Sequence, residues 1–354
     1  MTPTVPPQFS AVVIAHVERA RELAIAPNGD LFVGTQGQAI YVIPHADGAP
    51  QAPRVFVRLS DAPAAGVTFG DGYLYVGAQF GVYRIPYRTG DLTAREKPQK
   101  IASVRTSGGS RDHDTTSVAF AGGHLYASVG SSCNNCDPEL DPTRATVQEM
   151  NPDGSGMHAR AVHIRNAIAL ATNENTGTVW AGVAGQDELP EGHPYEIFDP
   201  VLLHQGTPDY GWPYCNEDRV PVRPGINCTD QTVARVVFPA YVTPIGAAFY
   251  PAHPHGAHVF PQRYWGGAFV TVHGSWHQPL SPPEVVFVPM KGDDPVRSVN
   301  WRNPDAQWST FAGGFQNAGG DRSARPTGIA VGPQGDLFVA DDQSGSIFRV
   351  RAKS

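Results

Sequence analysis

Short apolar segments alternate with glycine-containing turns along the chain. In the clearest example, residues 326–342, an apolar segment is followed by the turn Gly-Pro-Gln-Gly-Asp and by a second segment, Leu-Phe-Val-Ala. Similar phrases occur at 22–34, 66–77 and 117–128. Each phrase predicts two short strands joined by a tight turn. A phrase that recurs at intervals of tens of residues predicts a repeat architecture, and four-stranded repeats of this kind close into a β-propeller.

The first strand of the phrase has six copies. They are found near Leu23, Val67, Val118, Ile168, Ala247 and Ile329. The first four are about 44 to 51 residues apart, which is about one propeller blade each, whereas the last two intervals are about 80 residues. We therefore predict an all-β, six-bladed propeller forming one domain over residues 1–354. Long inserted loops, adding about 30 residues each, are expected in blades four and five, one covering 185–240 and the other 251–318.

Two further expectations concern the ends of the ring and the helices. The N-terminal segment at 12–16 is expected to complete the last blade, which would close the ring without a free edge. No segment has a sustained apolar period of 3.6 residues. Helices should therefore be short and confined to loops.

Composition excludes some classes of function. Charged residues make up 17% of the 354 residues, with 26 basic against 33 acidic side chains, and no basic run suggests a nucleic-acid partner. No stretch of 18 apolar residues predicts a membrane span. The first dozen residues lack the pattern of a signal peptide. This suggests either a cytosolic protein or the mature form of a secreted one.

The four cysteines favour the mature, secreted form. Cys133 and Cys136 form a Cys-x-x-Cys, but Asp137 follows where a c-type haem site has histidine, and no second such pair completes a zinc site. Of the three possible pairings we prefer the local bonds 133–136 and 215–228, which would tie surface loops in an oxidising compartment. Four unpaired thiols are the alternative. The predicted location is periplasmic or secreted.

Candidate catalytic residues precede the predicted inner strands, where a propeller faces its central channel. His113 stands before the third such strand, and an imidazole there can take a proton from a substrate hydroxyl. Arg165 and Asn166 stand before the fourth strand and Arg325 before the sixth. Paired arginines could hold a polyanionic small molecule. The alternatives are a surface-loop histidine and arginines that cap strands or pair with acids at blade edges.

The segment 184–196 is rich in carboxylates, with Gly and Pro between them. Hard oxygen donors suit Ca²⁺, although the spacing is not that of an EF-hand, and a solvated acidic loop is the alternative. Further along, Tyr210-Gly-Trp-Pro213 and His273-Gly-Ser-Trp-His277 place aromatic rings beside glycine. Such rings can stack on a sugar or on a planar cofactor, or can simply pack.

Taken together, these motifs resemble the glucose/sorbosone dehydrogenase family, the soluble quinoprotein sugar dehydrogenases built on a six-bladed propeller. The likeness extends over nearly the whole chain in the same motif order and is nearest to the sorbosone dehydrogenase-like branch. The matching motifs are Ser131-Ser-Cys-Asn-Asn-Cys136, Glu149-Met-Asn-Pro-Asp-Gly-Ser155, Arg165-Asn166, Asp187-Glu188, Tyr210-Gly-Trp-Pro213, Pro244-Ile-Gly-Ala-Ala-Phe-Tyr250, His273-Gly-Ser-Trp276, Arg325-Pro326 and Asp341-Asp342.

The resemblance implies a fold, two cofactors and a reaction. Pyrroloquinoline quinone (PQQ) would lie over the channel mouth with a Ca²⁺ ion on its reactive carbonyl. His113 would remove the proton from the anomeric hydroxyl of a sugar while hydride passes from that carbon to the quinone, which carries the redox step. An external electron acceptor would then reoxidise the quinone.

The resemblance also implies which residues form the site. Arg165, expected to act in catalysis as well, and Asn166 would contact the quinone, and Arg325 would hold its carboxylates. The other expected cofactor contacts are Trp276, His277 and Arg322. The expected calcium ligands are the carbonyls of Gly185 and Gln186 and a carboxylate of Asp187 or Glu188.

Two positions depart from the family pattern. Thr116 and Gln278 stand where the branch usually has arginine, so the predicted pocket has fewer cations for a tricarboxylate. Arg111 and Arg322 are candidates to compensate. Two other functions therefore stay open. One is a non-catalytic propeller that binds a carbohydrate or a protein partner, which the missing cations favour. The other is a calcium-dependent lactonase-like hydrolase, which would need carboxylates and asparagines from several blades on the axis.

Overall fold

The computed structural model describes residues 2–107, 112–190, 192–275, 277 and 281–353. Strands dominate it. Over these ranges the helices are two short 3₁₀ turns, η1 (Gln262–Tyr264) and η2 (Pro304–Gln307), both in loops of the fifth blade. The prediction of short helices confined to loops is confirmed. In the same ranges no helix has the length and apolar character needed to cross a membrane.

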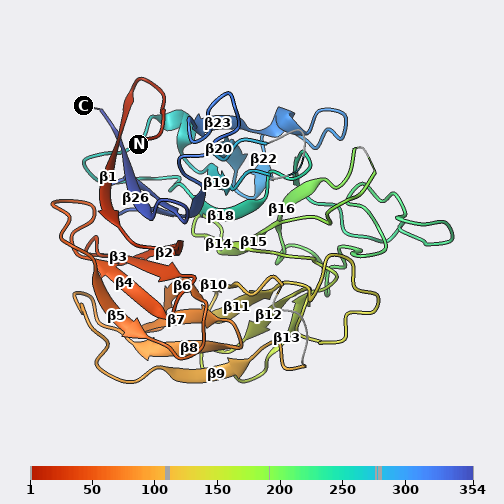
Figure 1. Ribbon diagram of the computed structural model, residues 1–354, viewed down its shortest axis with the longest axis horizontal. Helices are drawn as coiled ribbons and strands as arrows, with labels where there is room; N and C mark the ends of the chain where they lie inside the picture. Colours follow the sequence, from red (N-terminus) through yellow and green to blue (C-terminus); the bar gives the residue numbers. More distant parts are fainter. Residues whose placement is uncertain (1, 108–111, 191, 276, 278–280, 354) are drawn as a thin grey trace.

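Six sheets of four strands surround a central axis, as predicted (Figure 1). A single bridge between Thr35 and Ala64 links the first two sheets into one. The innermost strands all lie where the repeated phrase placed them. They are β2 (Ala20–Ile25), β6 (Ala64–Gly70), β10 (Thr116–Ala121), β14 (Ala169–Asn173), β18 (Pro244–Phe249) and β24 (Pro326–Val331).

The other strands of each blade follow outward from the innermost strand in antiparallel pairs. For the first three blades they are β3 (Leu31–Thr35), β4 (Ala39–Ile43) and β5 (Arg54–Arg58); β7 (Tyr73–Ala78), β8 (Gly81–Pro86) and β9 (Gln99–Ser103); and β11 (His124–Val129), β12 (Thr146–Met150) and β13 (His158–Ala161). For the last three they are β15 (Thr178–Val183), β16 (Glu196–Pro200) and β17 (Val236–Phe238); β19 (Ala268–Val272), β20 (Glu284–Val288) and β23 (Ser309–Ala312); and β25 (Leu337–Asp341), β26 (Ser346–Ala352) and β1 (Phe9–His16). A small hairpin, β21 (Met290–Lys291) with β22 (Asp294–Pro295), lies outside the blades.

The N-terminal strand closes the ring. β1 pairs antiparallel with β26, from Phe9 opposite Ala352 to His16 opposite Ser346, and so forms the outer strand of the last blade (Figure 1). The predicted segment 12–16 lies within it. Because the first and last segments of the chain share one sheet, the blade is completed only when both ends are in place.

The core lies between the blades. Six clusters of buried apolar side chains each join one blade to the next around the ring. Glycine allows the inner strands to approach closely. A Cβ atom on Gly66 would lie 2.2 Å from the carbonyl oxygen of Thr116, and one on Gly328 would lie 2.3 Å from that of Arg21. Both carbonyls belong to the inner strand of the following blade, so a larger residue would force the blades apart.

The long intervals of blades four and five are confirmed, but each contains strands of its blade. Residues 185–240 include β16 and β17, and 251–318 include β19, β20 and β23. Both preferred disulfides are present, Cys133–Cys136 and Cys215–Cys228, and there are no free cysteines. The second disulfide ties the loop between β16 and β17.

Candidate active site

The predicted catalytic and binding residues meet at one end of the channel. Arg325 stands directly before β24, and His113 and Asn166 stand three residues before β10 and β14, so all three lie at the starts of innermost strands. A Cβ atom on Gly130 would lie 2.5 Å from Cβ of His113 and 2.6 Å from Oδ1 of Asn166, so these two side chains flank one glycine. The tertiary structure thus assembles residues from three blades around this end.

His113 is held as a neutral imidazole with a defined tautomer. Its Nδ1 lies 3.0 Å from both the carbonyl oxygen and the Oγ of Ser131. Because a carbonyl only accepts, and because Ser131 Oγ donates its own proton to the carbonyl of Cys133, Nδ1 carries the hydrogen and Nε2 the lone pair. Burial, and secondarily the charge of Arg165, lowers the pKa of His113 to about 4. At neutral pH Nε2 is therefore a proton acceptor.

Arg105 fixes the backbone on which His113 stands. Its guanidinium donates to the carbonyl oxygens of His113 at 2.6 Å and of Thr115 at 2.9 Å, and to the Thr116 hydroxyl at 2.6 Å. His113 has φ 50°, in the left-handed region that is strained for most residues. Arg105 places a buried cation beside Thr116, the position where the sequence lacked the expected arginine. Burial lowers the pKa of this guanidinium to about 9, so it stays charged at neutral pH.

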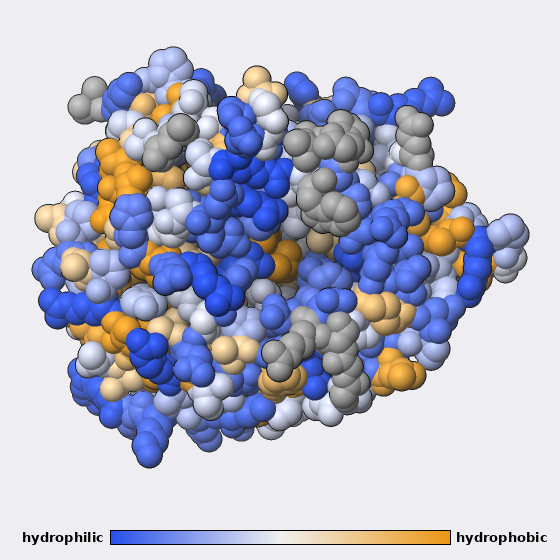
Figure 2. Space-filling model, viewed as in Figure 1, coloured by the Kyte–Doolittle hydropathy of each residue, from blue (hydrophilic) through white to orange (hydrophobic). Residues whose placement is uncertain are grey.

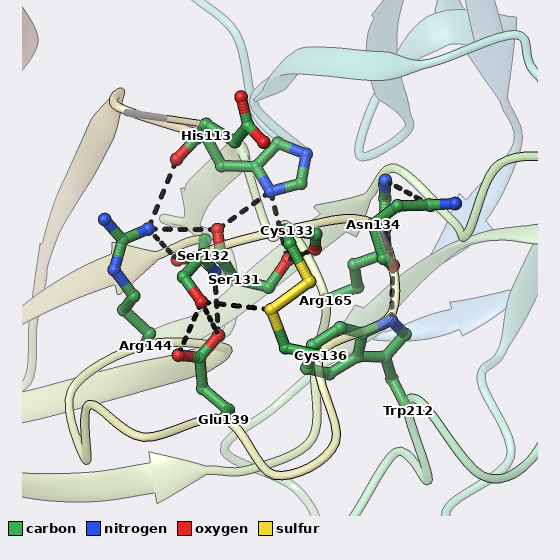
Figure 3. The surroundings of a disulfide bond; sticks show 12 residues. His113, Ser131, Ser132, Cys133, Asn134, Cys136, Glu139, Arg144, Arg165 and Trp212 are labelled. Atoms are coloured by element: carbon green, nitrogen blue, oxygen red, sulfur yellow. Dashed lines mark hydrogen bonds between the residues drawn. A yellow bond between two sulfur atoms is a disulfide. The ribbon is translucent and has the colours of Figure 1, made fainter. Parts of the chain in front are cut away.

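Asn134 and Arg165 form a buried clamp, drawn in Figure 3. Arg165 Nε donates to the Asn134 carbonyl at 3.1 Å, and Arg165 Nη2 donates to Asn134 Oδ1 at 2.9 Å and to Asp187 Oδ2 at 3.0 Å. Asn134 also pairs with the backbone of Asp187, accepting from its N–H at 2.8 Å and donating to its carbonyl at 3.1 Å. Trp212 Nε1 donates to the Asn134 carbonyl at 3.1 Å.

The loop that carries this asparagine is closed by the Cys133–Cys136 disulfide. The clamp therefore connects the Cys-x-x-Cys loop, the strand start at Arg165 and the acidic loop at Asp187. The acidic loop is also tied to blade five. His277 Nε2 lies 2.9 Å from Asp187 Oδ1, and the His277 ring stacks on Tyr241 with centroids 3.9 Å apart. Trp276, the other aromatic residue expected here, lies outside the described residues.

A second network lies at the same end between the first, fifth and sixth blades. His273 Nε2 lies 3.0 Å from Asp342 Oδ1, and Arg21 Nη1 lies 2.9 Å from Asp342 Oδ2. Arg325 donates from Nε to the His273 carbonyl at 3.1 Å and from Nη2 to the Gly274 carbonyl at 3.2 Å. Arg322 donates to the Ser275 carbonyl nearby. Three arginines thus converge here with one partly buried carboxylate, that of Asp342. Polar side chains cover much of the face seen in Figure 2, which views the molecule along the same direction as Figure 1.

This donor set fits a quinone that carries three carboxylates. The guanidiniums of Arg105 and Arg325 donate to backbone carbonyls and form no ion pair with a side-chain acid among the described residues. Fixed cations in a partly buried site favour a bound polyanion. Arg105 therefore adds a cation beside Thr116, whereas the charge of Arg21 is offset by its ion pair with Asp342. Gln278 and Arg111 lie outside the described residues.

The expected calcium ligands fit less well as they are placed. The carbonyl of Gly185 and the Oδ2 atom of Asp187 both accept hydrogen bonds from Arg165, and Asp187 Oδ1 contacts His277. Because the Arg165 guanidinium is hydrogen-bonded to these oxygens, its positive charge repels a divalent cation that approaches them. Gln186 is buried and Glu188 is exposed. The loop would bind Ca²⁺ only after Arg165 released it, so the metal takes part in no chemical step of the mechanism proposed below.

Sequence reasoning missed Arg21, Arg105, Asn134 and Asp342 as members of the site. Three of them carried a usable signal. Arg21 stands at the start of the first repeat as Arg325 does in the last, Asp342 ends the final repeated phrase, and Asn134 lies within the Ser131–Cys136 motif. Arg105 stands in a loop that has no counterpart in the repeat, and only its contacts identify it.

Buried titratable groups predict an unusual stability profile. Burial raises the pKa of Glu22 and Glu196 to about 8 and that of Glu217 to about 7, and it lowers the pKa of His113 and His273 to about 4. From pH 4.5 to 8 the folded chain holds more protons on these glutamates than the unfolded chain does, so stability falls as pH rises. Below pH 6.5 the two histidines have the opposite effect on stability, because they bind protons in the unfolded chain but not in the folded one. Above pH 6.5 they are largely neutral in both states and no longer affect the slope.

We therefore expect the free energy of unfolding to fall between pH 6.5 and 8, by at most about 1.4 kcal/mol per pH unit for each group. Urea denaturation at a series of pH values measures it. Glu196→Gln and Glu217→Gln should flatten the profile, whereas Glu96→Gln, in a surface loop, should not. Stability that is constant or rises between pH 6.5 and 8 would contradict these buried carboxyl groups.

Comparison with known proteins supports the fold. A family described as TrAA12-like matches residues 215–353. An uncharacterized protein of Borreliella burgdorferi is 21% identical over 348 residues, covering 94% of this chain and 86% of that protein. The iodide structure of a Trichoderma reesei member of Carbohydrate-Active Enzymes Family AA12 superposes with TM-score 0.81 at 17% identity, covering 99% of this chain and 98% of that one.

Two structures named for PQQ are also similar. The holo form of the pyranose dehydrogenase PQQ domain from Coprinopsis cinerea has TM-score 0.78 at 16% identity, covering 99% of this chain and 97% of that one. The PQQ-bound aldose sugar dehydrogenase of Streptomyces coelicolor has TM-score 0.66 at 14% identity, covering 98% and 99%. The chain thus has the six-bladed propeller fold of the soluble PQQ sugar dehydrogenases and of the AA12 proteins.

Proposed function

We propose that this protein is a PQQ-dependent sugar dehydrogenase that oxidises an aldose or a sugar aldehyde at C1. The observation that carries the proposal is the neutral imidazole of His113, which has an available Nε2 and lies at the channel end where several arginines converge. Similar structures named for PQQ and for sugar oxidation support the cofactor and the substrate class. A lactonase-like hydrolase would need carboxylates and asparagines from several blades on the axis. The arginines at this end of the channel therefore argue against that class of enzyme.

In this proposal the protein binds, orients and removes a proton. Nε2 of His113 accepts the proton of the substrate hydroxyl as the hydride, with its two electrons, leaves C1, so an aldose becomes a lactone. The bound quinone would supply the electron sink. Arg165 and Asn166 would contact the quinone near its reactive face, and Arg325, Arg322 and His277 would orient it. The aromatic ring expected at Trp276 belongs to the same proposal.

Calcium belongs to the proposal as a required partner of quinone binding. Gly185, Gln186, Asp187 and Glu188 would hold it once Arg165 turned towards the quinone. The two disulfides support a periplasmic or secreted location. The proposal also places the protein in the sorbosone dehydrogenase-like branch, as a single domain over residues 1–354. An external electron acceptor would reoxidise the quinone.

One titration tests the proposed function. PQQ is added to metal-free protein with and without Ca²⁺ while its absorbance is followed, and aldoses are then offered with an artificial electron-accepting dye. We expect calcium-dependent binding followed by dye reduction. Absence of any spectral change at tens of micromolar PQQ would reject the proposal in favour of a non-catalytic propeller. Binding that is unaffected by Ca²⁺ would reject the calcium site alone.

A further inference from the structure

A second pocket lies beside the candidate active site, on the outer side of the same end of the propeller. It has a volume of about 400 Å³ and is formed by the segment after β13 and the disulfide-tied loop between β16 and β17. The segment 162–168 runs from β13, the outer strand of blade three, to β14, the inner strand of blade four. His163 lines the pocket at the outer part of this segment, and Arg165 stands two residues further towards the axis.

The walls of this pocket combine an aromatic face with hydrogen-bond acceptors. His163 Nδ1 lies 2.8 Å from Asp209 Oδ1, and the rings of His163 and Tyr214 meet edge to face with centroids 6.3 Å apart. Asp230 adds a second carboxylate, and no Lys or Arg stands among the described residues that line the pocket. An anionic ligand is therefore disfavoured, whereas a ligand with several hydroxyl donors is favoured.

Gln231 provides an independent sign of a ligand. Its side chain is 95% buried and lines the pocket, and its amide nitrogen donates to the carbonyls of Tyr210 at 2.9 Å and Asn216 at 3.0 Å. These bonds fix the amide so that Oε1 faces away from both carbonyls. Oε1 has no hydrogen-bond partner among the described residues. A buried acceptor without a donor is costly. Because Oε1 is itself enclosed, a ligand hydroxyl would reach it, and relieve that cost, once the side chain turned towards the pocket.

Tyr214 connects this pocket to the candidate active site. Its hydroxyl donates to Asp137 Oδ1 at 2.6 Å, and Arg223 pairs with the same carboxylate at 2.7 Å, so the ring is held in place. Tyr214 also lines a smaller pocket of about 90 Å³, together with Gln186 of the acidic loop. The two pockets share this aromatic wall and form a row that leads outward from the acidic loop.

We infer that the pocket of His163, Asp209 and Tyr214 binds a neutral sugar unit, so that the protein acts on disaccharides or longer saccharides whose terminal residue reaches His113. The sugar ring would lie against Tyr214, and its hydroxyls would donate to Asp209 and Gln231. The inference rests on the proposed function for the identity of the neighbouring site, but the binding of a saccharide to this pocket needs no quinone.

The test measures binding to the protein without PQQ. Calorimetric titration compares cellobiose with glucose. We expect tighter binding of cellobiose, weakened about tenfold in Tyr214→Ala, which corresponds to about 1.4 kcal/mol. Tyr214→Phe keeps the ring and should weaken it less. Trp265→Ala removes a partly exposed aromatic ring at the opposite end of the inner strands and is the matched control, with unchanged binding expected.

The outcomes separate the two proposals. With PQQ and dye, the ratio of KM for cellobiose to KM for glucose should rise about tenfold in Tyr214→Ala if the pocket holds the second sugar unit. Cellobiose that fails to bind, or that binds equally well to Tyr214→Ala, overturns the inference, as does binding of glucosamine without binding of neutral sugars. Tyr214-dependent binding without dye reduction supports the pocket and overturns the dehydrogenase.

Discussion

Replacing His113 with asparagine is expected to lower kcat by about 10²–10⁴-fold, the usual contribution of a positioned general base. Asparagine tolerates the left-handed backbone that this position adopts, φ 50°, and its amide can donate to the Ser131 carbonyl as Nδ1 does. What the variant loses is Nε2, the proton acceptor. Quinone affinity should therefore change little while turnover collapses. Stopped-flow reduction of the quinone by an aldose measures the chemical step, and absorbance titration measures the binding.

A matched control separates this effect from a change in the backbone. His45 also has a left-handed backbone, φ 53°, but it stands exposed after β4. His45→Asn is the same substitution in the same conformation and should leave both kcat and quinone affinity unchanged. If His113→Asn turned over at the rate of the unmodified protein, the imidazole would not be the base.

Replacing Arg165 with alanine is expected to lower the free energy of unfolding by about 3–5 kcal/mol, because several acceptors held by this buried guanidinium lose their donor. The Asn134 carbonyl and side chain, the Ala184 and Gly185 carbonyls and Asp187 would all lose a donor. Burial of the guanidinium, opposed by Asp187, lowers the pKa of Arg165, which indicates that its charge is enclosed and not merely at the surface. Urea denaturation measures the stability.

The same variant should lose measurable quinone binding at concentrations that saturate the unmodified protein. Arg160→Ala is the matched control, since Arg160 also donates to three loop carbonyls, those of Leu202, His204 and Gly206, but extends from the outer strand β13. It should lower stability without changing quinone affinity. Asn134→Ala removes part of the clamp, and its quinone affinity should lie between those of Arg165→Ala and Arg160→Ala. Equal quinone affinity in Arg165→Ala and Arg160→Ala would exclude Arg165 from the binding site.

The fold was predictable because its signal is local and repeated. Alternating apolar residues and turn glycines occur within each phrase, and β2 and β24 are recognisable from a dozen residues each. Both disulfides were predictable for a similar reason, since each joins cysteines close in sequence. The roles of the predicted site residues stay predictions that the proposed experiments address.

The candidate site was predictable only in part. Position before an inner strand identified His113, Arg165 and Arg325, because ring closure brings equivalent positions of a repeat to one end. It did not identify Arg105, which donates to the backbone of His113 from a loop outside the repeat. Arg105 also brings a cation beside Thr116 from another segment of the chain. Whether the site holds enough positive charge for the quinone stays a prediction that the binding titration addresses.

The sequence by itself determined the strands, their order and the closure of the ring, because hydrophobic periodicity and turn chemistry act between neighbouring residues. Only the tertiary structure decided which side chains meet at the mouth of the channel. Arg21 and Asp342 pair at 2.9 Å although 321 positions separate them. Such contacts depend on how six blades close around the axis, and no local pattern encodes the direction in which a loop side chain will then point.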